Sequence, residues 1–206
     1  MKTVTLQPLD QTPLTLVGCG VLRKEVNYLI QKNAWNLHTH YLESALHNYF
    51  NRLASELNAA LAEREGRGEK TLVLYGGCHP LMDKFLQAHR TCRTAGQNCI
   101  VQLIGYDIFM QELEQGAYFL LEDWALSWEP VITDCLGHNL SVIREIFHGS
   151  HQYLLGLRTP CSGDFTQAAE AAAELVDLPL RWMDVPLDHL EQVLKEAIEQ
   201  RLSQST

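Results

Sequence analysis

The sequence predicts an α/β protein in which a mostly parallel sheet carries helices on both faces, a Rossmann-like three-layer sandwich with the option of two small lobes. Short apolar runs typical of buried strands alternate along the chain with amphipathic segments of helical period. The 206 residues, of which 46% are hydrophobic and 20% charged, suffice for one well-packed domain. We therefore expect a single domain over residues 1–206, with a soft lobe boundary near residues 130–150.

In the first half of the chain, four apolar runs are separated by helical segments. Strands are expected at residues 14–17, 35–41, 71–75 and 91–95. Helices are expected at residues 21–31, at residues 48–65 and from Pro80 onward. In the second of these helices, apolar residues recur every three or four positions, which is the spacing of one buried face. They are Phe50, Leu53, Leu57 and Leu61.

Helices and strands keep alternating in the second half of the chain. Asn98 suits a helix N-cap, so a helix is expected to open at Cys99 and to run to Glu114. The remaining strands are expected at residues 117–121, 153–157 and 180–183. The remaining helices are expected at residues 122–128, where the helix stops before Pro130, and at 140–147, 165–176 and 187–202.

The charge and the termini exclude several classes of protein. A formal net charge of −9 argues against binding nucleic acids or anionic membranes, because phosphate groups are repelled. The N-terminus lacks the apolar core of a signal peptide, and no apolar stretch reaches the roughly 18 residues that span a bilayer. We therefore expect a cytoplasmic protein, whose six cysteines are buried hydrophobes, catalytic thiols or metal ligands rather than disulfides.

Four cysteines stand between a predicted strand and the helix that follows it, or at the start of a helix: Cys19, Cys78, Cys99 and Cys161. Ligands of open parallel sheets bind beyond the carboxyl ends of the strands, and a helix N-terminus favours thiolate over thiol. No CxxC pair is present, so position rather than spacing carries the signal. Buried structural thiols, a metal or cluster site and a catalytic thiol all remain open, whereas Cys92 and Cys135 are interpreted as structural.

Other polar residues near these turns extend the candidate site. His79 directly follows Cys78 and is a candidate fourth ligand, with a helix-capping imidazole as the alternative. His47 is a candidate lining residue of a cleft, and Asn48 suits the cap of the helix at residues 48–65. The motifs GxGxxG, GxxxxGK[ST] and GxSxG are absent, which disfavours dinucleotide enzymes, triphosphate enzymes and α/β-hydrolases.

Five short motifs occur in a definite order: GCGVLRKE at 18–25, LHN at 46–48, YGGC at 75–78, NCI at 98–100 and GAYFL at 116–120. In order and spacing, this set resembles a family catalogued as domain of unknown function 1638, over about residues 14–185. The resemblance implies a recurring cysteine at Cys19, Cys78 and Cys99 and a recurring His-Asn pair, while Cys161 lies outside the pattern. It also implies a link with anaerobic and one-carbon metabolism, including corrinoid-dependent methyl transfer.

Together these observations favour an iron–sulfur protein. Cys19, Cys78 and Cys99 would bind three irons of a four-iron–four-sulfur cluster, and the fourth iron would take Cys161 or His79 or stay open. Zinc is the second choice of metal, as a thiolate site that accepts a methyl group. A thiol enzyme without metal and a non-enzymatic accessory protein that binds a corrinoid or a metal are the competing classes. In the accessory protein, His47 and the segment 124–128 would line a larger pocket for a small molecule or a corrinoid-protein partner.

Overall fold

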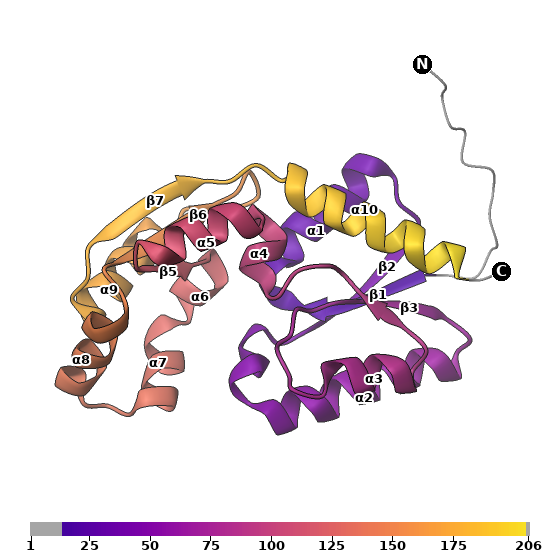
Figure 1. Cartoon of the computed structure of the whole chain (residues 1–206), viewed down its shortest axis with the longest axis horizontal. Coiled ribbons are helices and arrows are strands. Elements are labelled where there is room, and N and C mark those ends of the chain that lie inside the picture. The colour runs from indigo at the N-terminus through magenta and orange to yellow at the C-terminus, as the bar shows by residue number, and fades with distance from the viewer. Residues whose placement is uncertain (1–13, 205–206) are drawn as a thin grey trace, which may run out of the picture.

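The computed structural model describes residues 14–204 and contains two parallel sheets with helices around them (Figure 1). The first sheet has the strand order β2-β1-β3-β4. Its strands are β1 (Leu14–Cys19), β2 (Leu37–Leu42), β3 (Lys70–Leu74) and β4 (Cys92–Arg93). The helical segments of this half are η1 (Gly20–Leu22), α1 (Arg23–Asn33), η2 (Ser44–Asn48), α2 (Phe50–Gly66), α3 (Met82–Ala88) and α4 (Cys99–Ile104).

The second sheet has the strand order β5-β6-β7. Its strands are β5 (Ala117–Leu120), β6 (Tyr153–Arg158) and β7 (Leu180–Asp184). The helices of this half are α5 (Tyr106–Glu114), α6 (Glu122–Leu126), α7 (Trp128–Leu136), α8 (Leu140–Ser150) and α9 (Thr166–Val176). The last helix, α10 (Asp188–Ser203), returns to the first sheet and contacts α4, β3 and β4.

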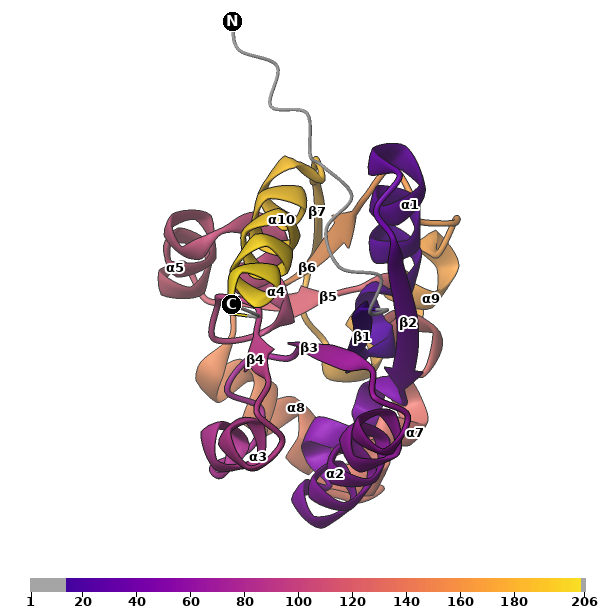
Figure 2. The ribbon, with the colours of Figure 1, turned by 90° about the vertical axis from the view of Figure 1, so that its right-hand side faces the viewer.

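Alternation of side chains along the strands explains why helices cover both faces of the first sheet. Leu16 and Leu72 belong to the core beneath α1, α4 and α10, whereas Val17 and Val73 belong to the core beneath α2 and α3. Figure 2 shows these two helix layers above and below the sheet. The strands β1 and β3 are buried on both faces, which explains why each forms a continuous apolar run in the sequence.

The two sheets share part of one hydrophobic core. The cluster that contains Leu16 of β1 also contains Phe119 of β5, Leu155 of β6 and Leu190 of α10. Two further contacts join the carboxyl ends of the sheets. The Thr159 hydroxyl donates a hydrogen bond to the buried Glu25 carboxylate at 2.7 Å, and the Lys24 ammonium donates to the Glu122 carboxylate at 2.7 Å. The carboxyl ends of both sheets therefore face a common region.

The predicted α/β class with parallel strands and surrounding helices is confirmed. The strands form two separate sheets rather than one. The chain leaves the first sheet after α4 and enters the second at β5, ahead of the residues 130–150 at which a lobe boundary was expected. The single helix predicted over 99–114 is two helices, because Gly105 adopts φ +85° between them. Among residues 14–204, no helix combines the length and apolar character needed to cross a membrane.

A further difference from the sequence-based expectation is the helix α7. Pro130 was expected to mark the end of a helix, but α7 begins at Trp128 and holds Pro130 in its first turn. A proline is tolerated there because the first-turn N–H groups have no partner within the helix.

Candidate functional site

Three of the four cysteines singled out by the sequence line one small pocket. Cys19 is the last residue of β1, Cys78 lies in the loop after β3, and Cys99 is the first residue of α4. The chain passes from β1 to β2 on one side and from β3 to β4 on the other, so the strand order reverses between β1 and β3. Crevices at such reversals are the usual ligand sites of open parallel sheets. We call this site the cysteine pocket.

Glycine backbone geometry holds the loops of Cys78 and Cys99 together. The Gly77 amide donates a hydrogen bond to the Gln97 carbonyl at 2.7 Å. At Gly76 a β-carbon would clash with the Gln97 carbonyl, so only glycine permits this approach. The Asn98 side chain accepts a hydrogen bond from the Val101 amide at 2.8 Å, which confirms the predicted N-cap and fixes the start of α4.

Burial, rather than the helix terminus, dominates the acidity of these thiols. Desolvation raises the pKa of Cys19 to about 12, with smaller contributions from Cys78 and Asp123. Desolvation also raises the pKa of Cys78 and of Cys99, and for Cys99 the neighbouring Cys19 and Cys78 add to the effect. The expectation that these positions favour thiolate is therefore wrong for the protein without a bound metal.

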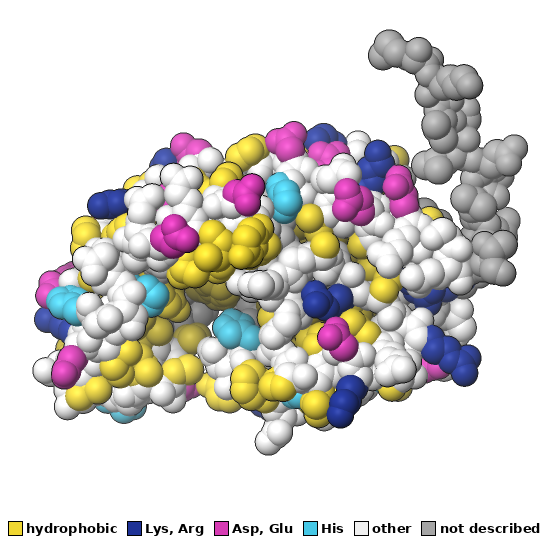
Figure 3. Space-filling model, viewed as in Figure 1, with side chains coloured by type: hydrophobic (Ala, Val, Ile, Leu, Met, Phe, Trp, Pro, Cys, Tyr) yellow, Lys and Arg dark blue, Asp and Glu magenta, His cyan; other side chains and the backbone are white. Residues whose placement is uncertain are grey.

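Two side chains link the cysteine pocket to a wider cleft. His47 of η2 and Trp124 of α6 line the cysteine pocket and two larger neighbouring cavities, and their ring centroids are 5.9 Å apart. We call the first sheet with its helices, residues 14–104, the first lobe, and the second sheet with its helices, residues 106–184, the second lobe. Figure 3 shows this face hollowed between the two, with hydrophobic side chains of α5 on its rim. The first lobe thus supplies the cysteines, and the second supplies Trp124 opposite them.

His47 has a defined state at the junction of these cavities. Its Nδ1 lies 3.2 Å from the Ser44 carbonyl oxygen, which can only accept a hydrogen bond, so Nδ1 carries the proton. Burial lowers the pKa of His47, and the ring is neutral at pH 7. Its Nε2 therefore has a free lone pair. His47 is among the lining residues of both larger cavities.

The donor set of the cysteine pocket suits a thiolate-bound centre. Its lining contains three thiols and no charged side chain. The Tyr75 hydroxyl is buried there beside Cys19, and burial, followed by the proximity of Cys19 and Cys78, raises the pKa of Tyr75. Across residues 14–204, no three His, Cys, Asp or Glu side chains are grouped closely enough to hold a single metal ion.

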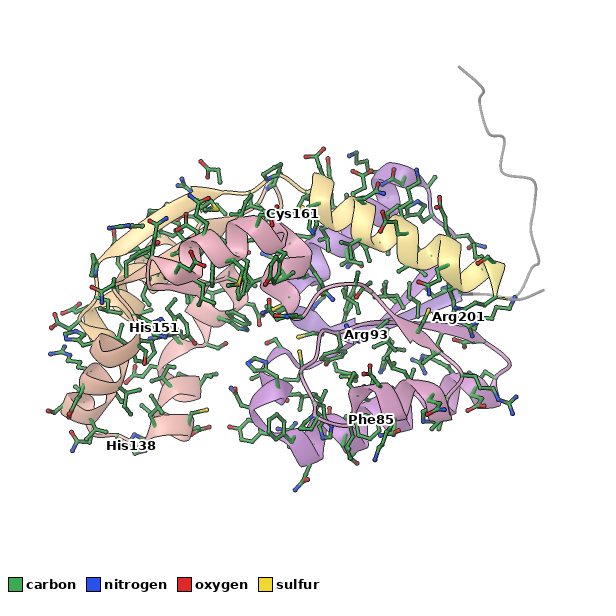
Figure 4. The ribbon with its side chains drawn as sticks, in the orientation of Figure 1. Phe85, Arg93, His138, His151, Cys161 and Arg201 are labelled. Carbon is green, nitrogen blue, oxygen red and sulfur yellow. The ribbon has the colours of Figure 1, made fainter. Side chains whose placement is uncertain are left out.

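The structure does not bring Cys161 or His79 into the cysteine pocket. Cys161 follows β6, and its pKa is raised by burial and then by Glu25, not by the other cysteines. In Figure 4 it lies above α4, whereas the cleft and His151 lie below. The His79 Nδ1 accepts a hydrogen bond from the Leu81 amide at 2.9 Å, and its ring packs between Phe50 and Phe85. The His79 imidazole is thus engaged locally, in the turn that precedes α3.

Other assignments from the sequence also change. Asn48 lines the cleft but does not cap α2, whose N-cap is Tyr49 with no side-chain hydrogen bond. Cys135, which was interpreted as structural, is exposed and lines the same cavity as Asn48. Sequence reasoning missed Tyr118 and His151, which line both larger cavities. Tyr118 belongs to the GAYFL motif, but that motif did not identify it as a cavity residue, and no motif includes His151; both reach the cleft through the packing of β5 and α8.

The sequence model of one protein family, described as "Protein of unknown function (DUF1638)", matches residues 41–194. This chain belongs to the DUF1638 family. No curated protein and no solved structure matches it. The matched region of this DUF1638 chain includes Cys78 and Cys99, together with His47 and Trp124, whereas Cys19 lies upstream of it. Most of the cysteine pocket is therefore built from the part of the chain that defines the family.

Proposed function

We propose that this DUF1638 protein is an iron–sulfur protein in which Cys19, Cys78 and Cys99 each bind one iron of a four-iron–four-sulfur cluster. The convergence of these cysteines from three separate segments in one uncharged pocket is the observation that carries the proposal. With Cys161 and His79 outside the pocket, the fourth iron is left open toward the cleft.

The acidity of the thiols supports a bound centre over a free thiol nucleophile. A catalytic cysteine needs a lowered pKa, because only the thiolate attacks. All three pocket thiols have raised pKa values. A metal overcomes this cost, because it displaces the thiol proton when the sulfur binds.

The room beside the thiols favours a cluster over a single zinc ion. Zinc gathers its thiolates around one atom, whereas a cluster takes one thiolate on each iron. The cysteine pocket itself is small, about 20 Å³, but Cys78 and Cys99 also line a neighbouring cavity of about 380 Å³, which gives a cluster room on the cleft side.

The role of the chain's own residues follows from this assignment. When bound, the cluster supplies a Lewis-acidic or redox-active iron. His47 accepts a proton at Nε2 beside it, and Trp124 covers the site from the second lobe. In line with what the sequence resemblance implies, we propose that this centre acts in anaerobic or one-carbon metabolism.

The decisive experiment is purification without oxygen, followed by an absorption spectrum and assays of iron, zinc, cobalt and sulfide. A brown protein with iron and sulfide in equal amounts is expected. Zinc without sulfide would replace the proposal with a zinc-thiolate methyl acceptor, and a protein that contains neither iron nor zinc after this purification would refute both metals.

Single variants assign the ligands. Each of Cys19→Ser, Cys78→Ser and Cys99→Ser is expected to lose most of the iron and sulfide. Cys161→Ser and Cys92→Ser are matched controls, which keep the metal because neither residue lines the pocket. Loss of iron in Cys161→Ser with retention in Cys78→Ser would contradict the assignment.

A further inference from the structure

The cleft contains a second chemical environment beyond the cysteines. A cavity of about 280 Å³ lies between η2 and the helices α6–α8. Its walls are aromatic, and the ring centroids of Tyr118 lie 5.3 Å from those of Trp128, 5.2 Å from those of Phe147 and 5.0 Å from those of His151. We call it the aromatic cavity. It falls at the small end of the range of ligand pockets, with space for about one ring.

The aromatic cavity adjoins the cysteine site through shared walls. The cavity of about 380 Å³ that reaches Cys78 and Cys99 shares His47, Tyr118, Trp124 and His151 with it. Only the side chains that the two cavities share therefore separate a molecule in the aromatic cavity from the cavity that Cys78 and Cys99 line.

The charge of these walls restricts the ligand. Of the residues that the structure describes, no Lys, Arg, Asp or Glu lines the aromatic cavity or the cavity beside it. Burial lowers the pKa of both His47 and His151, so neither imidazole provides a cation at pH 7. Burying an ionised ligand here would leave its charge without a partner, which is costly.

The walls also hold a hydrogen-bond acceptor. Because His47 Nδ1 carries the proton, its Nε2 is an acceptor, and it has no hydrogen-bond partner among the described residues. The indole nitrogens of Trp124 and Trp128 also lack partners within the described part of the chain, but both atoms are buried away from the surface of the cavity. A hydroxyl group on the ligand can donate a hydrogen bond to His47 Nε2.

We propose that the aromatic cavity binds an uncharged compound of about one ring that carries a hydroxyl or similar group, and holds it beside Cys78 and Cys99. The binding itself needs no cluster. Only the role of this compound as the substrate of the cluster rests on the proposed function.

The test uses three one-ring probes of similar size and different charge, which are p-cresol, benzoate and benzylamine. Dissociation constants are measured at pH 7 by saturation-transfer NMR on the protein purified without oxygen. We expect p-cresol to bind at least tenfold more tightly than either charged probe. Equal binding of all three, or tighter binding of a charged probe, would overturn the proposal.

Cavity-filling variants locate the bound probe. Val131 of α7 lines the aromatic cavity, whereas the exposed Glu129 on the same helix lines none of these cavities. Val131→Trp is expected to weaken p-cresol binding at least tenfold, and Glu129→Trp to leave it unchanged. Ala45→Phe fills the cavity from the opposite lobe and is used if Val131→Trp does not fold. Unchanged affinity in a folded cavity-filling variant would refute the site.

A second pair of measurements separates this proposal from the cluster. His47→Phe keeps a ring but removes the acceptor, so p-cresol is expected to lose about tenfold while toluene binds as before. Cys78→Ser is expected to lose iron and to keep p-cresol affinity, because Cys78 does not line the aromatic cavity. Loss of p-cresol binding in Cys78→Ser would refute the cavity, whereas unchanged iron there would refute the cluster alone.

Discussion

The Gly77 amide donates to the Gln97 carbonyl at 2.7 Å, and this one hydrogen bond ties the loop of Cys78 to the loop that precedes Cys99. Both loops belong to neighbouring strand-to-helix connections at the edge of the first sheet. The spacing of the two cysteines therefore depends on backbone packing rather than on any contact between their side chains.

Gly76→Ala tests that dependence. Its new β-carbon would overlap the Gln97 carbonyl, so we expect the free energy of unfolding to fall by about 1–3 kcal/mol and iron retention to fall with it. Gly149→Ala is the matched control, because nothing lies within 4 Å of a β-carbon at this position in α8. There we expect a gain of about 0.5–1 kcal/mol. Urea unfolding measures both, and equal effects would contradict the packing argument.

The raised thiol pKa values predict an order of alkylation in the metal-free protein. With a pKa of about 12, Cys19 is almost wholly protonated at pH 8, and its reaction with iodoacetamide should rise about tenfold per pH unit up to that value. The exposed Cys135 should be labelled first. Peptide mass spectrometry follows each site, and fast labelling of Cys19 at pH 8 would show that its thiol is not desolvated.

The buried hydrogen bond between the lobes should contribute more than the exposed ion pair beside it. Thr159→Val leaves the buried Glu25 carboxylate without this donor, and we expect a loss of about 1–3 kcal/mol in stability. Thr159→Ser keeps the hydroxyl and should lose much less. Lys24→Ala removes an exposed partner of Glu122 and should cost at most about 1 kcal/mol. Thermal or urea unfolding ranks the three variants, and a reversed order would be inconsistent with this structure.

The pH dependence of His47 follows from its burial. Its pKa in the folded protein lies below the ordinary value of about 6.5, so the unfolded chain takes up a proton first as the pH falls. The contribution of His47 to stability is therefore present above about pH 6.5 and is lost as the pH drops through its folded pKa. Ring NMR of the metal-free protein should show a midpoint below 6.5 and a proton on Nδ1. A midpoint at or above 6.5 would show that burial does not control the titration of this ring.

The strands and helices could be predicted because their signals are local. The apolar run at β3, the Asn98 cap before α4 and the glycines after β1 and β3 each act within a few residues. Two local signals, at Gly105 and at Pro130, led to incorrect helix boundaries. Gly105 breaks a helix that periodicity would continue, and Pro130 sits in a first turn rather than after a last one.

The composition of the site was only partly predictable, because it depends on strand order. Cys19 and Cys161 have the same local setting, a buried strand followed by a turn and a helix. They differ because β1 adjoins β3 in the first sheet, whereas β6 lies in the second. No pattern near Cys161 shows this. His79 illustrates the opposite case. It directly follows Cys78, which does line the cysteine pocket, but its own ring accepts a hydrogen bond from the Leu81 amide and does not line that pocket.

All three pocket cysteines come from residues 14–104, whereas the aromatic walls Tyr118, Trp128 and Phe147 come from the second sheet and its helices. Under the proposed function, the metal ligands and these aromatic walls are thus encoded in separate stretches of the gene, and His47 is the wall that comes from the first stretch. Substitutions in α6–α8 would then change which molecule the cleft accepts without moving a proposed metal ligand, so the ligands of this scaffold could diversify while the proposed cluster stays constant.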